Sequence, residues 1–305
     1  MNHPREGTEV TNRDDKKSVV SRNGAVWTLP SCAADGQGHD HTHNVGFGGP
    51  WAQVISSPRM WQYKQVASAY ATRFDATAAR LFGYPFVFQA LATSRTPEVV
   101  VDFGCGPGAV AALAAEQWNC LVHAVDPSVA MLDIARRQYC DPRVSYRHIS
   151  PGSLTFLSDG TVDAVMCTLV MATTPDVGML ECIVREAHRV LRPGGHFAVL
   201  EGNPAGVGVK FTMKRPAAGP LPKRPGDAWP VLLKTVAGPY LEVVDYYWDL
   251  PTYLRLFEAA GFRDVYSSAP TLEMAKQVAD PEDLAAASWD TERIHPPYVL
   301  IYGRR

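Results

Sequence analysis

The segment VVVDFGCGPGAV, residues 99–110, constrains the fold of this chain more than any other. A run of β-branched residues, typical of a buried strand, stops in a loop that contains Gly104, Gly106 and Gly108. The alanine-rich sequence AVAALAAEQW then has the composition of a helix. Glycines at such a turn let the backbone approach a ligand closely, and they direct the free N–H groups of the helix at it. The segment therefore predicts a strand, a ligand-binding turn and a helix.

A second predicted strand, LVHAV, ends in Asp126, which follows the glycine loop by about 20 residues. An acid at this spacing can accept both hydroxyls of a ribose. Gly104, Gly106 and Ala109 also match the dinucleotide pattern G-x-G-x-x-G/A. Because many ligands contain ribose, these residues alone do not distinguish a nicotinamide dinucleotide from other candidate ligands.

Asp102 and the sequence after the second strand separate the ligand classes, because DFGCGPG resembles motif I of the class I S-adenosylmethionine-dependent methyltransferases. The resemblance continues in AVDPSVAMLDIARR, SDGTVDAVMCTLV and ECIVREAHRVLRPGGHFAVLE, in the usual order and spacing. The four motifs together cover roughly residues 60–305 and are far more specific than any one of them. They favour a methyltransferase over a nicotinamide-dependent dehydrogenase.

The resemblance implies an α/β fold with a doubly wound, Rossmann-like seven-stranded sheet, an antiparallel last strand and an inserted cap hairpin. Hydrophobic patterning places the first five strands near 98–102, 121–125, 143–148, 162–167 and 196–201. FRDVY and PYVLIYG supply the last two strands. The hairpin is predicted from WPVLLKTVAGPYLEVVDYYW, whereas the preceding GNPAGVGVKFTMKRPAAGPLPKRPGD is too rich in glycine and proline for a regular element.

Three parts are expected along the chain. Residues 1–50 lack apolar periodicity and are predicted to form a disordered N-terminal arm. Residues 51–95 show apolar and aromatic residues at helical spacing, which predicts one or two helices that form a lid in related enzymes. Residues 96–305 form the methyltransferase core, with the inserted loop and hairpin at 202–248. The alternating histidines His39, His41 and His43 have no cysteine partner or fixed scaffold, so no metal is predicted.

Charge and composition limit the classes of partner and the cellular location that are expected for this protein. A net charge of -2 gives no general basic footprint for nucleic acid, so a small molecule is the expected partner. No run approaches the roughly 20 apolar residues of a membrane helix, and the first residues contain no apolar secretion segment. The six cysteines lack the paired spacing of a zinc site, and reduced thiols fit a cytoplasmic enzyme. The sequence leaves the oligomeric state open.

The resemblance names S-adenosylmethionine as the cofactor and implies which residues bind it. Asp102 is expected near its ammonium group, Asp126 at the ribose hydroxyls, and Pro127 and Met131 on either side of the adenine. The complete set comprises Tyr70, Asp102, Gly104, Cys105, Gly106, Asp126, Pro127, Met131, Gly152, Ser153 and Cys167.

One departure from the family lies after the third strand. Related enzymes often have Gly-Asp-Ala there, with the Asp on the adenine amino group, whereas this chain has ISPGSLTF. Gly152 and Ser153 are therefore expected to supply the contacts. Because this acid is missing, a second hypothesis remains, in which the chain is a non-methylating protein on the same fold, such as a cyclase or a regulatory subunit.

Glu201 is the candidate catalytic residue, because it closes the fifth strand at the edge where the carboxyl ends of parallel strands face the ligand. It could orient or deprotonate an acceptor; a solvated loop carboxylate is the alternative. Tyr63, Asn203 and Tyr247 are candidate acceptor-binding residues.

These features predict methyl transfer from S-adenosylmethionine to a nitrogen or oxygen atom of a small molecule. The chain resembles the small-molecule, type 11-like enzymes and, through its inserted aromatic hairpin, the bacterial secondary-metabolite branch. An RNA or protein methyltransferase would share every cofactor motif and stays an alternative.

Overall fold

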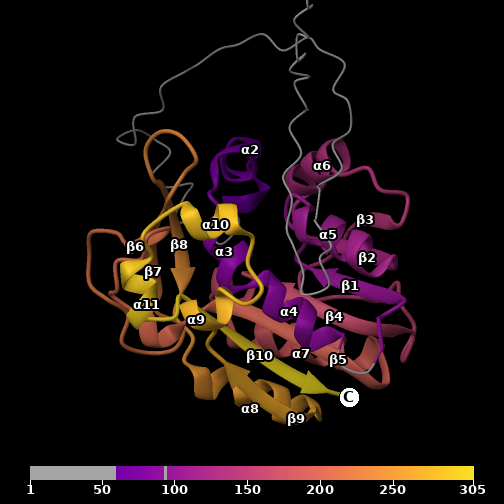
Figure 1. Cartoon of the computed structure of the whole chain (residues 1–305). Coiled ribbons are helices and arrows are strands. Elements are labelled where there is room, and N and C mark those ends of the chain that lie inside the picture. Colours follow the sequence, from indigo (N-terminus) through magenta and orange to yellow (C-terminus); the bar gives the residue numbers. More distant parts are fainter. Residues whose placement is uncertain (1–59, 93–94) are drawn as a thin grey trace, which may run out of the picture.

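The computed structural model describes residues 60–92 and 95–305, which form an α/β fold around a seven-stranded sheet (Figure 1). The strand order is β3-β2-β1-β4-β5-β10-β9. The strands are β1 (Val99–Phe103), β2 (Leu121–Asp126), β3 (Val144–His148), β4 (Val162–Thr168), β5 (Leu191–Gly202), β9 (Arg263–Ser268) and β10 (Tyr298–Arg304). β1 to β5 pair in parallel, and β10 is antiparallel to both β5 and β9. The predicted seven-stranded sheet with an antiparallel last strand is confirmed.

Helices cover both faces of this sheet and create two cores, because successive strand residues point to opposite faces. Val100 of β1 packs in one core with α4 (Tyr84–Leu91) and α5 (Ala109–Trp118). The next residue, Val101, packs in the other core with α7 (Val177–Val190) and α8 (Leu250–Ala260). The sheet is thus buried on both sides, and its strand ends are left to form a site.

The carboxyl ends of β1 and β4 mark the point where the strand order reverses. β1 pairs with β2 on one side and with β4 on the other. The chain leaves β1 and β2 through α5 and α6 (Val129–Gln138), on one side of this point. A crevice forms at such a reversal in open α/β sheets, and ligands bind there.

The segment before β1 contains more helices than predicted. η1 (Met60–Gln62), α2 (Lys64–Arg73), α3 (Thr77–Phe82) and α4 precede the sheet. The side chain of Asp75 accepts a hydrogen bond from the backbone N–H of Thr77 (3.1 Å), which starts α3. Gly83 separates α3 from α4 at a close approach, since a Cβ there would lie 2.6 Å from Leu200. The predicted arm at 1–50, its histidines and residues 51–59 of the lid lie outside the described residues.

A second, smaller antiparallel sheet has the order β6-β7-β8 and lies to one side of the main sheet (Figure 1). The predicted hairpin forms as β7 (Ala228–Leu233) and β8 (Leu241–Tyr246) around the turn that contains Ala-Gly-Pro. β6 (Lys214–Pro216) adds an edge strand, and η3 (Pro204–Gly206) lies upstream of it, within a stretch predicted to be irregular. Pro216 ends that edge strand, a position where the missing N–H is tolerated.

Two further departures involve the end of the chain. β5 begins at Leu191 and not at 196, because Leu191 pairs with Val162 of β4 and the backbone of Arg305 pairs with Gly194 (2.8 Å) and Gly195 (2.9 Å), which extends the ladder through RPGG. Three short helices, α9 (Leu272–Ala275), α10 (Pro281–Ala285) and α11 (Asp290–Ile294), had no sequence prediction. Asp283 of α10 forms an ion pair with Arg80 of α3 (2.5 Å), which ties this segment to the helices before β1.

Two observations concern the expectations from composition. Within residues 60–92 and 95–305, no helix is both long enough and apolar enough to cross a membrane. Among the cysteines of the described part of the chain, four carry free thiols, namely Cys105, Cys120, Cys167 and Cys182. Cys140 is disulfide-bonded, so the expectation of uniformly reduced thiols is wrong at this residue.

Candidate active site

A cavity of about 730 Å³ opens at the carboxyl ends of β1, β2 and β4, where the strand order reverses. Its volume lies within the range of about 300–1,000 Å³ that is usual for small-molecule sites. Seven of the residues predicted for the cofactor line it: Tyr70, Gly104, Gly106, Asp126, Pro127, Met131 and Gly152. Residues far apart in the sequence therefore meet at one crevice.

The glycine loop forms one end of this cavity. The N–H groups of Gly104 and Cys105 both donate to the carbonyl oxygen of Val125 (2.8 and 2.9 Å), which holds the loop against β2. Gly104 has a φ of +83°, and a Cβ there would lie 2.5 Å from Val170. Gly106 has a φ of +51°, and a Cβ there would meet no described atom within 4 Å. The loop thus packs tightly at Gly104 and presents bare backbone to open space at Gly106.

Asp126 lies at the end of β2 and on the cavity wall. Its Oδ2 accepts from the N–H of Gly106 (2.9 Å), and its Oδ1 accepts from the N–H of Ser128 (2.7 Å). Burial raises the pKa of this carboxyl to about 6, although both backbone bonds act against the shift. A carboxylate has about four acceptor sites, so each oxygen can still accept a bond from a ligand hydroxyl.

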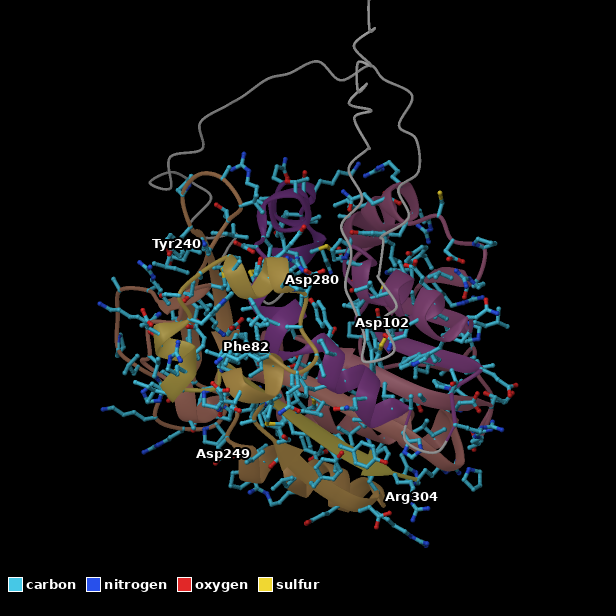
Figure 2. The ribbon with its side chains drawn as sticks, viewed as in Figure 1. Phe82, Asp102, Tyr240, Asp249, Asp280 and Arg304 are labelled. Carbon is cyan, nitrogen blue, oxygen red and sulfur yellow. The ribbon has the colours of Figure 1, made fainter. Side chains whose placement is uncertain are left out.

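Asp102 lies deep in the molecule at the penultimate position of β1 (Figure 2). Its side chain is fully buried and does not line the cavity, and neither carboxylate oxygen has a hydrogen-bond partner at normal distance among the described residues. The backbone N–H of Ala111 in α5 is still close enough to act against the rise in its pKa. Burial, together with the nearby charge of Asp126, raises its pKa to about 8. Such a group is costly to bury and favours a cationic neighbour.

The lid joins the cofactor end of the cavity through Ser128. The Ser128 hydroxyl donates to the carbonyl oxygen of Trp61 (2.5 Å) and accepts from the N–H of Met131 (3.2 Å), at the start of α6. Tyr70 of α2 contacts Trp61 edge to face, with ring centroids 5.0 Å apart, and stacks on Phe74 at 4.8 Å. In Figure 1, α2 lies over the sheet beside α6. The lid helices therefore supply aromatic rings to the cavity.

The loop after β3 contributes an apolar edge. Ile149, Pro151 and Gly152 line the cavity, whereas Ser153 does not. Gly152 has a φ of +72°, and a Cβ there would lie 2.8 Å from the Met179 sulfur. The Ser153 hydroxyl lies 3.5 Å from that of Thr155. Gly152 is thus placed to touch a ligand through its backbone, while the Ser153 hydroxyl is engaged elsewhere.

Glu201, the candidate catalytic acid, is nearly fully buried and does not line the cavity. Its Oε1 accepts from the N–H groups of Val170 (2.9 Å) and Met171 (2.6 Å) in the loop after β4. Burial raises its pKa to about 8. Val170 is the residue whose side chain packs against Gly104. In this geometry Oε1 of Glu201 holds the loop beside the glycine cradle, whereas Oε2 is buried with no hydrogen-bond partner among the described residues.

The two cysteines of the predicted cofactor set are buried and are not among the cavity-lining residues. Cys167 packs in the core on the α7 side of the sheet. Burial raises the thiol pKa of both Cys105 and Cys167 well above the ordinary value, so both stay protonated near neutral pH. Protonated, enclosed thiols are poor nucleophiles.

The three candidate acceptor-binding residues lie away from the cavity lining. Tyr63 is 43% exposed. The Asn203 side-chain amide bonds the backbone of Pro296 (3.0 Å) and Ala205 (3.1 Å). Tyr247 pairs through its backbone N–H with Asp227 (2.9 Å).

Sequence reasoning missed much of the acceptor side of the cavity. Its lining there includes Trp61, Phe74, Asp75, Tyr84 and Lys234. The first three stand near Tyr70 in the lid segment, where helical spacing was a signal that could have found them. Lys234 arrives from the β7–β8 turn, and no pattern in the sequence indicates that contact. The described residues contain no group of His, Cys, Asp and Glu that could hold a metal ion.

Known proteins resemble this chain in sequence and in fold. Residues 100–195 match the model of the methyltransferase domain family. N-demethylindolmycin N-methyltransferase of Streptomyces griseus is 34% identical over 248 residues, which cover 80% of this chain and 98% of that protein. This match spans almost the whole length of that protein.

Two solved structures share the fold. An S-adenosylmethionine-dependent methyltransferase from Listeria monocytogenes has a TM-score of 0.53 at 18% identity, covering 75% of this chain and 97% of its own. The CcbJ methyltransferase from Streptomyces caelestis has a TM-score of 0.52 at 18% identity, covering 75% and 96%. Together with the sheet order, the glycine loop and the long match to the Streptomyces griseus enzyme, these structures establish the family. The chain belongs to the class I S-adenosylmethionine-dependent methyltransferases and transfers a methyl group from that cofactor to a small-molecule acceptor.

Proposed function

We propose that this enzyme methylates a nitrogen atom of a small natural product held between the glycine loop and the lid. The observation that carries the proposal is the match to an N-demethylindolmycin N-methyltransferase over almost the whole length of that protein. An oxygen acceptor would use the same cofactor residues, and no observation favours it. The absence of a nucleic-acid partner and the cytoplasmic location remain predictions from composition.

Four features of the cavity and of the strand beneath it fit S-adenosylmethionine. Gly106 presents bare backbone to open space, as close contact with a ligand requires. Asp126 keeps free acceptor sites on both oxygens at the wall, which suit the two ribose hydroxyls. Asp102 is a buried carboxylate with no hydrogen-bond partner in the described chain, and it would be stabilised by the ammonium group. The apolar edge at Ile149 and Gly152 suits the adenine face.

The cofactor supplies a methyl group on a positively charged sulfur, so the protein has no need to activate the donor. The residues of the chain must hold the acceptor nitrogen in line with that methyl group and exclude water. Tyr70 and Phe74 on the lid offer aromatic faces, which position a flat acceptor and also favour a cationic sulfur. A neutral amine needs to lose its proton only after transfer, so this proposal requires no catalytic carboxylate and assigns Glu201 a positioning role.

Binding and turnover test this function together. The protein is titrated by calorimetry with S-adenosylmethionine, S-adenosylhomocysteine and NAD, and is then incubated with S-adenosylmethionine and a panel of small aromatic amines, with and without a carboxylate, that includes N-demethylindolmycin. We expect the two sulfur ligands to bind and NAD not to bind, and mass spectrometry to show one added methyl group on nitrogen. Failure of both sulfur ligands to bind would refute the proposal and bring back the non-methylating alternative.

Asp126→Ala should weaken binding of S-adenosylhomocysteine by about 1–3 kcal/mol, because it removes the acceptor of the ribose hydroxyl bonds. Asp133→Ala is the matched control, since Asp133 is exposed on α6 and does not line the cavity. Calorimetry measures both affinities, and thermal unfolding checks that both variants fold. An unchanged affinity in Asp126→Ala would exclude the proposed ribose contact.

Asp102 should lose its proton when the cofactor binds. Its pKa of about 8 leaves it mostly protonated at pH 7, and an adjacent ammonium group would lower that pKa. Calorimetry of S-adenosylhomocysteine binding in two buffers of different ionisation enthalpy should therefore show release of up to about one proton. Asp102→Asn should abolish the release. Equal heats in both buffers for the unmodified protein would contradict the pairing.

The same carboxyl predicts a pH dependence of stability without ligand. The pKa of Asp102 is higher in the folded protein than its ordinary value, so the folded state binds the proton more tightly than the unfolded chain does. This contribution to stability is fully present at low pH and is lost as the pH rises through about 8. Urea unfolding of Asp102→Asn should show a smaller loss of unfolding free energy between about pH 4 and pH 8, the window bounded by the ordinary and the raised pKa of this carboxyl.

Two variants of Glu201 separate a positioning role from a catalytic one. Glu201→Ala leaves the buried N–H groups of Val170 and Met171 without an acceptor, and should raise the Kd for S-adenosylhomocysteine by about 10- to 100-fold. Glu201→Gln keeps an oxygen for both bonds and should keep most of the affinity and turnover. A Gln variant that binds normally but no longer turns over would show that Glu201 is catalytic instead.

A further inference from the structure

The turn between β7 and β8 completes the acceptor side of the cavity. The N–H of Asp75 donates to the carbonyl oxygen of Lys234 (3.1 Å), and the N–H of Val236 donates to that of Arg73 (2.7 Å). Phe74 forms an antiparallel bridge with Thr235 between these two bonds. Extended backbone alternates its side chains, so Lys234 and Val236 reach the cavity while Thr235 is buried in the turn. The cap hairpin and the end of α2 therefore form one continuous wall.

Lys234 differs from the other charged groups that line the cavity. The charged lining residues are Asp75, Arg80, Asp126, Asp176 and Lys234. Each of the three acids accepts a hydrogen bond from the backbone N–H two residues further along the chain. Asp126 also accepts one from the N–H of Gly106. Arg80 donates to both oxygens of Asp283, at 2.9 Å for its shortest Nε bond. Four of these five charges are thus already engaged at hydrogen-bonding distance.

The ammonium group of Lys234 forms an ion pair with Asp75, but it lies 3.7 Å from Oδ2, beyond hydrogen-bonding distance, and its side chain is 36% exposed. Asp75 Oδ1 is held by the N–H (3.1 Å) and the hydroxyl (2.5 Å) of Thr77. In the described chain, Lys234 is therefore the lining cation whose donors remain available to a ligand. A charged donor in a partly enclosed site is best matched by an anionic oxygen.

An aromatic wall adjoins this cation. Tyr70 and Phe74 are stacked with an interplanar angle of 10°, both line the cavity, and Phe74 immediately precedes Asp75 in the chain. Aromatic pairs favour offset or edge contacts with a further ring. A planar ring against this pair would carry its substituents toward the β7–β8 turn, where Lys234 lies.

We propose that the acceptor is a planar aromatic molecule that carries a carboxylate, with Lys234 binding the carboxylate and the Tyr70–Phe74 pair contacting the ring. This inference rests on the proposed function and names the class of substrate for the same site. Lys234 is a specificity-determining residue in this scheme. Its attachment to the lid at Phe74 and Asp75 places it on a wall that is built from other segments than the loop after β1, which carries Gly106, and the end of β2, which carries Asp126.

The test compares a charged probe with a neutral one of the same shape. Indole-3-acetate and indole-3-acetamide are titrated by calorimetry into the protein saturated with S-adenosylhomocysteine. The acetate should bind about tenfold more tightly than the amide, as expected for a charge-assisted hydrogen bond. Lys234→Met should remove this preference, and Lys234→Arg should retain it. Lys276→Met is the matched control, because Lys276 pairs with Glu273 on the surface and does not line the cavity.

Each other outcome overturns the inference in a recognisable way. Equal binding of the two probes, or binding of neither, removes the carboxylate recognition, while retained affinity for S-adenosylhomocysteine leaves the proposed function standing. A loss of S-adenosylhomocysteine affinity in Lys234→Met would assign the lysine to the carboxylate of the cofactor. If the unmodified protein fails to bind S-adenosylhomocysteine, the proposed function and this inference fail together.

Discussion

The hydrogen bonds accepted by Asp126 are the interaction on which the rest of the site depends. One oxygen takes the N–H of Gly106 and the other takes that of Ser128, so a single carboxylate ties the glycine loop after β1 to the end of β2 and the start of α6. Ser128 in turn holds Trp61 of the lid. A shift of Asp126 would therefore move the cradle, the first turn of α6 and the lid together. This chain of contacts explains how a loop, a strand end and a lid reach one geometry.

Two other carboxyl groups, Glu201 and Asp102, are buried at an energetic cost. The loop after β4 offsets part of this cost for Glu201, and a bound ligand would offset it for Asp102. Oε1 of Glu201 accepts from the N–H groups of Val170 and Met171, which places Val170 against Gly104, while its Oε2 has no hydrogen-bond partner among the described residues. Asp102 has no such compensation among the described residues, and its raised pKa reflects that. Unsatisfied buried charge concentrates at functional sites, where binding supplies the missing partner. In this protein the uncompensated acid lies directly beneath the glycine loop.

Sequence reasoning was strongest where local pattern and chemistry coincide. The strands predicted near 98–102, 121–125 and 162–167 followed from apolar runs, and they correspond to β1, β2 and β4. It was weaker where a residue has several possible neighbours. Glu201 was placed correctly at a strand end, yet whether its carboxylate faces a ligand or a loop depends on the path of residues 169–173. Tyr63, Asn203 and Tyr247 do not line the cavity, and their acceptor-binding role stays a prediction, since their neighbours come from other segments.

The sequence by itself determined the family, the seven-stranded sheet and the residues of the glycine loop and β2 that meet at the strand-order reversal. These follow from contiguous patterns, because strand, turn and helix signals each span only a few residues. The tertiary structure alone decided the acceptor side. There, the β7–β8 turn bridges to the end of α2 across about 160 residues of chain, and this pairing brings Lys234 beside Phe74. Backbone pairing between distant segments leaves no local signal, so only the folded chain reveals that wall.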